Sequence, residues 1–148
     1  MSSLPPIAGG TIEVSTTRWP LIYVRFVGQA DDDTFDQYLD ELTRAISRPG
    51  RRTFLFDATE CGYVSSYARR RQAEWMRQQE SIIRRETAGV AFALTAPLVR
   101  GALTAILWLE PLSCAYAVVR DEAAALARCR GWLEPYGLTI PERDGVPA

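Results

Sequence analysis

Short apolar segments that suit β-strands alternate with longer segments whose apolar residues have helical spacing, and this order constrains the fold most. Residues 21–27 (LIYVRFV) are almost continuously apolar, which is typical of a strand buried on both faces of a sheet. Residues 11–16 alternate apolar and polar side chains, which predicts an edge strand. Further strands are predicted at residues 53–57, 89–95 and 114–119.

Four predicted helices complete the pattern. The first begins at three aspartates (31–33), whose carboxylates suit the free N–H groups and the positive end of a helix dipole. The others cover about residues 66–86, 97–110 and 121–134. Strands separated by helices imply parallel pairing, and the first strand is expected to pair antiparallel with the second. We therefore expect an α/β fold with a single five-stranded mixed, mainly parallel sheet and four helices.

The chain of 148 residues has the length of one domain. Residues 1–10 and 135–148 are rich in proline and glycine, which predicts flexible ends around a domain at 11–134. No signal peptide is visible, and no apolar run approaches the ~20 residues that span a bilayer. Three cysteines at unrelated spacings argue against a disulfide framework and favour a reducing compartment, so we expect a cytoplasmic protein without a membrane span.

The absence of histidine limits the chemistry of this chain. All 17 basic residues are arginine, so the usual general base, the Ser-His and Cys-His pairs and the commonest zinc ligand are missing. No Gly-rich phosphate loop or acidic metal cluster is visible. We expect no catalytic residues, no cofactor and no metal, although mechanisms based on aspartate, tyrosine or arginine stay open. A formal net charge of −1 argues against general nucleic-acid binding.

A polar stretch follows the third predicted strand. Asp57 is placed at the carboxyl end of that strand, where open α/β sheets form ligand crevices, or it fixes the turn by accepting hydrogen bonds. Thr59 and Cys61 follow in the predicted loop. Cys61 is either a half-buried loop cysteine or a thiol activated by nearby arginines.

Ser65 and Ser66 precede the second predicted helix. There a serine hydroxyl caps the helix, or it accepts a phosphate that the helix dipole and the arginines at positions 69 and 70 would stabilise. The candidate site in this region therefore comprises the two serines with Asp57, Thr59, Cys61, Arg69 and Arg70.

The element order resembles the STAS/SpoIIAA-like fold over about residues 11–134. The last third resembles the SpoIIAA-like group, in which a helix ends near a proline, a strand follows and an Asp-capped helix closes with Ala and Trp-Leu. The counterparts in this sequence are Pro111, residues 115–119, Asp121, Ala125 and Trp132-Leu133.

This resemblance implies a regulatory or protein-interaction module. In STAS antagonists, the loop after the third strand carries an Asp-Ser-Ser-Gly-type motif, and a partner kinase phosphorylates its serine to switch partner binding. The matching region here reads Val64-Ser65-Ser66-Tyr67, with valine before the serines and tyrosine after them. The fold is shared more loosely with lipid-binding CRAL-TRIO proteins, which implies a small apolar or lipid-like ligand as the alternative function.

The third predicted helix, PLVRGALTAILWLEP, is apolar on more than one side. Its core stripe comprises Val99, Ala102, Leu103, Ile106 and Leu107. Four apolar residues lie outside this stripe: Leu98, Ala105, Trp108 and Leu109. Their apolar character predicts that this side of the helix contacts the domain itself, a second copy or an apolar ligand.

The second predicted helix is basic, with six arginines against three glutamates over residues 66–86, whereas the first helix is acidic. This contrast favours a charge-guided protein partner or a self-contact. We therefore expect a non-enzymatic module that binds a protein partner or forms a homodimer.

Overall fold

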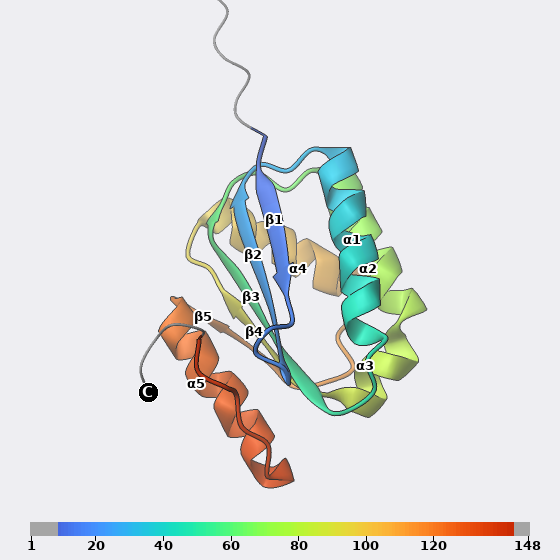
Figure 1. The fold of residues 1–148 in the computed structure, drawn as a ribbon. Helices are drawn as coiled ribbons and strands as arrows, with labels where there is room; N and C mark the ends of the chain where they lie inside the picture. Colours follow the sequence, from blue (N-terminus) through green and yellow to red (C-terminus); the bar gives the residue numbers. More distant parts are fainter. Residues whose placement is uncertain (1–8, 144–148) are drawn as a thin grey trace, which may run out of the picture.

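The computed structural model describes residues 9–143, which form one sheet with helices on both faces (Figure 1). The strands lie in the sheet in sequence order, and β1 is antiparallel to β2 while all other pairs are parallel. The predicted fold class and edge position of the first strand are therefore confirmed. The strands are β1 (Thr11–Ser15), β2 (Leu21–Gly28), β3 (Arg52–Cys61), β4 (Thr87–Ala93) and β5 (Tyr116–Val119).

Five α-helices occur in the described residues, one more than predicted, because the segment at 66–86 is divided. Gln79 has φ −101° and ψ 10°, outside the helical region, and it separates two helices. The bend brings Ile83 into the same core as Trp75 and Met76. The helices are α1 (Asp32–Ile46), α2 (Ser66–Gln78), α3 (Glu80–Glu86), α4 (Pro97–Leu109) and α5 (Glu122–Leu133), followed by a short 3₁₀ turn (Glu134–Tyr136).

The helices divide between the two faces of the sheet, with α1 and α2 on one side and α5 on the other (Figure 1). The alternation of side chains along β3 supplies both cores. Phe54 and Ala58 point toward the face that carries α1, α2 and α4, whereas Leu55 packs against α5. A helix layer on each face explains why the central strands are apolar almost throughout.

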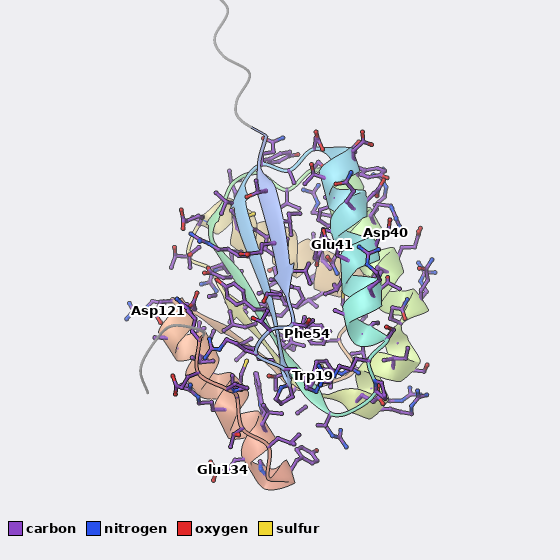
Figure 2. All side chains as sticks on the ribbon, viewed as in Figure 1. Trp19, Asp40, Glu41, Phe54, Asp121 and Glu134 are labelled. Carbon is purple, nitrogen blue, oxygen red and sulfur yellow. The ribbon has the colours of Figure 1, made fainter. Side chains whose placement is uncertain are left out.

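The aspartate caps predicted for α1 and α5 are confirmed. Asp31 accepts a hydrogen bond from the Thr34 amide at 2.8 Å, and Asp121 accepts one from the Ala124 amide at 2.8 Å. Figure 2 shows Asp121 and Glu134 at the two ends of the α5 segment. These caps fix where α1 and α5 begin.

Several predicted boundaries differ from the structure, and β4 covers Thr87–Ala93 in place of 89–95. β3 continues to Cys61 because its last residues still pair with β2, beyond an irregularity between Arg25 and Val27. β5 begins only at Tyr116, so Cys114 lies in the preceding loop. Packing also extends past the domain end predicted at residue 134, since Leu138 and Ile140 contact the core beneath α5. Of the flexible ends predicted at 1–10 and 135–148, residues 1–8 and 144–148 lie outside the described residues.

Candidate functional site

The two serines before α2 have different environments. Ser65 is the N-cap: its backbone is extended and its hydroxyl accepts a hydrogen bond from the Ala68 amide at 3.1 Å. Ser66 is the first residue of the helix and is exposed. Arg69 donates to the Val64 carbonyl at 2.8 Å, so its guanidinium lies against the same loop. The predicted cap is confirmed at Ser65, and a phosphoacceptor role for either serine stays a prediction.

Asp57 lies inside β3, not in a loop, and its side chain faces α5. It is the last residue of β3 that pairs with β4, and alternation places it on the same face as Leu55. Its Oδ1 accepts hydrogen bonds from the Thr59 amide at 3.1 Å and the Thr59 hydroxyl at 2.7 Å. The candidate site predicted from the sequence is therefore divided, because strand alternation turns Asp57 away from Ser65 and α2.

A tyrosine that sequence reasoning missed joins Asp57 to α5. The Tyr23 hydroxyl donates to Glu122 at 2.8 Å and approaches Asp57 Oδ2 at 3.4 Å, while Arg143 contacts Glu122 at 2.9 Å. Burial, followed by the hydrogen bond to Glu122, raises the pKa of Tyr23 above its ordinary value. These hydrogen bonds link β2, β3 and α5. The only sequence signal was one polar-tipped residue within LIYVRFV.

The three cysteines have weakly acidic thiols. Burial raises the pKa of Cys61, Cys114 and Cys129 to about 11 in each case. Cys61 lies at the end of β3, where its thiol donates a weak hydrogen bond to the Gly62 carbonyl at 3.5 Å. The arginines of α2 do not lower its pKa, so the thiol stays protonated near neutral pH.

An apolar cavity of about 120 Å³ lies between the sheet and the helices α1, α2 and α4. Aromatic rings of neighbouring strands form one wall, with Phe56 stacked 6.3 Å from Phe26 and 5.4 Å from Phe92 between ring centroids. Among the polar residues that line it, the Tyr38 hydroxyl donates to the Gln72 side-chain carbonyl at 2.8 Å. A dry apolar cavity of about 150 Å³ can bind benzene. This cavity can therefore hold one ring or a short aliphatic segment.

The outer side of α4 exposes large apolar side chains. Trp108 is 86% exposed, Leu98 73% and Leu109 58%. Val99 and Ile106 are buried on the opposite side of the helix. The predicted division of α4 into a core stripe and a leftover apolar set is confirmed for these residues, whereas Leu103, Ala105 and Leu107 are half-buried. Trp108 is not a core residue.

The acidic and basic helices contact each other within the chain. Asp36 of α1 accepts hydrogen bonds from the Tyr67 hydroxyl at 2.8 Å and from Arg71 at 3.1 Å. Acidic residues such as Asp40 remain exposed on α1 (Figure 2), and Arg70 is exposed on α2. Some of the opposite charges on α1 and α2 therefore contact each other within the chain and hold the two helices together.

Across residues 9–143, no three histidine, cysteine, aspartate or glutamate side chains gather in a way that could hold a metal ion. None of the helices in this part of the chain combines the length and apolar character needed to cross a bilayer.

Comparison with known proteins identifies the fold. No protein-family model and no curated protein sequence matches this chain significantly. An uncharacterized DUF3478-family protein from Shewanella loihica PV-4, described as having a SpoIIAA-like fold, superimposes with a TM-score of 0.60 at 20% identity, covering 87% of this chain and 98% of that one. Apo-SiaC from Pseudomonas aeruginosa superimposes with a TM-score of 0.54 at 16% identity, covering 80% and 99%. The chain has the SpoIIAA-like fold, as the resemblance in its sequence predicts.

Proposed function

We propose that this protein is a non-enzymatic regulatory or protein-interaction module whose contact surface is the outer side of α4. The SpoIIAA-like fold fits such a module. The observation that carries the proposal is the 86% exposure of Trp108. Tryptophan is enriched among the residues that dominate binding energy at protein interfaces, and an exposed apolar cluster of this kind marks interaction sites.

We further propose Ser66 as the site of a regulatory phosphorylation. The Ser65 hydroxyl already accepts the Ala68 amide, whereas Ser66 is exposed at the start of α2. A phosphate on Ser66 would lie at the positive end of the helix, near the exposed Arg70. Ser66→Glu should therefore change partner affinity with little change in thermal stability. Intact-mass measurement of the protein from its native cells tests the modification, and a protein free of phosphate under several growth conditions would contradict it.

Trp108→Glu tests the interaction surface, with Tyr136→Glu as the matched control. Tyr136 is also exposed, at 51%, but lies in the turn after α5 on the other face of the sheet. Affinity capture from native lysate should recover a partner with wild type and with Tyr136→Glu, but not with Trp108→Glu. Circular dichroism should show that both variants are folded. A partner retained by Trp108→Glu would contradict the assignment of the surface to α4.

A second function, the binding of a small apolar ligand, is favoured by the cavity beneath α4. Ala102 lines this cavity and is 6% exposed, so Ala102→Leu would fill part of it. Ala127→Leu makes the same change at an exposed position of α5, away from the cavity and from α4, and serves as the control. Benzene should raise the melting temperature of wild type and Ala127→Leu, but not of Ala102→Leu. If benzene leaves the melting temperature of wild type unchanged, the cavity does not bind ligands of this kind.

A further inference from the structure

Apolar and small residues on the outer side of α4 form a continuous stripe, and all of them except the half-buried Ala105 are exposed. Leu98, Gly101, Ala105 and Trp108 follow each other at intervals of three, four and three residues, and Leu109 lies beside them. Residues at such intervals share one side of a helix. We call these five residues the outer stripe. It contains no charged residue, so no like charges would meet if two such stripes came together.

We propose that the outer stripe binds the outer stripe of a second copy of this chain, with the two α4 helices antiparallel about a two-fold axis level with residue 103. This inference rests on the proposed function and names the partner of the same surface.

The spacing of large and small residues supports this register. Leu98 and Trp108 lie five residues on either side of position 103, and Gly101 and Ala105 lie two residues on either side. In an antiparallel pair centred there, Leu98 would face the partner's Trp108 and Gly101 would face the partner's Ala105. Small residues would meet at the middle of the contact, where the helix axes approach most closely, and the large apolar residues would close both ends.

Gly101 gives an independent reason for a close approach from outside. Glycine weakens a helix interior, and a Cβ atom placed at Gly101 would meet, apart from its chain neighbours and the backbone of its own helix, no described atom within 4 Å. Its backbone conformation does not require glycine either. Gly131 of α5 has equally open surroundings, but α5 carries no exposed large apolar side chain, so Gly131 provides a matched control. A glycine at position 101 leaves room for the backbone of a second copy to approach α4 closely.

The exposed area is sufficient for the core of a dimer interface. From their exposures of 73%, 86% and 58%, Leu98, Trp108 and Leu109 present on the order of 400 Å² of apolar surface per copy. A standard interface buries about 800 Å² per partner, of which the apolar centre is only a part. The stripe therefore supplies the centre of the contact, and the polar flanks of α4 supply the rim.

The first measurement is the dimer dissociation constant by sedimentation equilibrium. Wild type should be a dimer, Gly101→Leu should raise the constant at least about tenfold, and Gly131→Leu should leave it unchanged. Circular dichroism of both variants checks that they fold. A wild-type protein that stays monomeric up to about 1 mM, or equal effects of the two substitutions, would overturn the proposal.

The second measurement tests the register by oxidation at pH 8. The double variant Gly101→Cys/Ala105→Cys should form covalent dimers, because the two positions face each other across the axis and fall within disulfide reach. Gly101→Cys alone should not, since the two copies of position 101 are offset along the helices. Wild type controls for the native thiols, whose pKa values near 11 slow their oxidation. A dimer that crosslinks through Gly101→Cys alone would show a different register.

The outcomes separate this inference from the proposed function. A monomeric wild type that still captures a Trp108-dependent partner would overturn the pairing of two copies and leave α4 as an interaction surface. A monomer without any Trp108-dependent partner would overturn both.

Discussion

Arg52 Nη2 donates a hydrogen bond to Glu86 Oε2 at 2.9 Å, and this pair joins the start of β3 to the end of α3. The Arg52 side chain is fully buried. It also donates to the carbonyl groups of Gly50 at 3.0 Å and Arg48 at 2.6 Å. Burial lowers the pKa of Arg52, but these acceptors and Glu86 compensate for its loss of hydration.

Arg52→Met should therefore lower the free energy of unfolding by about 3 kcal/mol, because Glu86 and several carbonyl groups lose their donor. Chemical denaturation provides the measurement. Arg25→Met is the control, since Arg25 pairs with Glu60 at the surface and little should change. Equal stability of Arg52→Met and wild type would show that the buried pair contributes nothing net.

The Ser65 cap can be tested against its neighbour. Ser65→Ala should lower the free energy of unfolding by about 1 kcal/mol, because the Ala68 amide loses its acceptor at the start of α2. The melting temperature should fall by about 4 °C. Ser66→Ala removes an exposed hydroxyl with no such bond and should be close to neutral. An equal loss in both variants would place the cap elsewhere.

Tyr23 predicts a dependence of stability on alkaline pH. Its pKa is raised in the folded protein by burial and by Glu122, so the neutral phenol stabilises the fold below the unfolded pKa of about 10. That contribution is lost as the pH rises above this value, because the unfolded chain releases the proton first. Urea denaturation from pH 8 to 11 should show a steeper loss for wild type than for Tyr23→Phe. At pH 8, Tyr23→Phe itself should cost about 1.5 kcal/mol, and parallel pH profiles would contradict the assignment.

The cysteines predict slow alkylation of the folded protein. With pKa values of about 11, Cys61 and Cys114 are almost wholly protonated at pH 8, whereas an unfolded thiol has a pKa near 8.5. Iodoacetamide should react on the order of 100-fold faster in denaturant, and the rate in the folded state should rise about tenfold per pH unit. Rapid modification of Cys61 at neutral pH would revive the reactive-thiol interpretation.

Local patterns in the sequence were enough to predict the fold. The continuous apolar character of residues 21–27, the alternation at 11–16 and the aspartate caps at positions 31 and 121 each depend on neighbours along the chain. The two sides of α4 also follow from helical spacing alone, although the spacing left open whether the domain itself covers Trp108, which is exposed. Where an element continued or divided without a change of pattern, as at Gln79, the prediction was wrong.

Only the tertiary structure decided how the candidate site is assembled. Asp57 faces α5 because β3 continues through it and alternates, and its neighbour Tyr23 meets Glu122 across 99 positions of sequence. The apolar cavity arises because three helices fail to fill the space above the phenylalanine rings of the sheet. Such contacts depend on how whole elements pack, and periodicity within a single element carries no information about them.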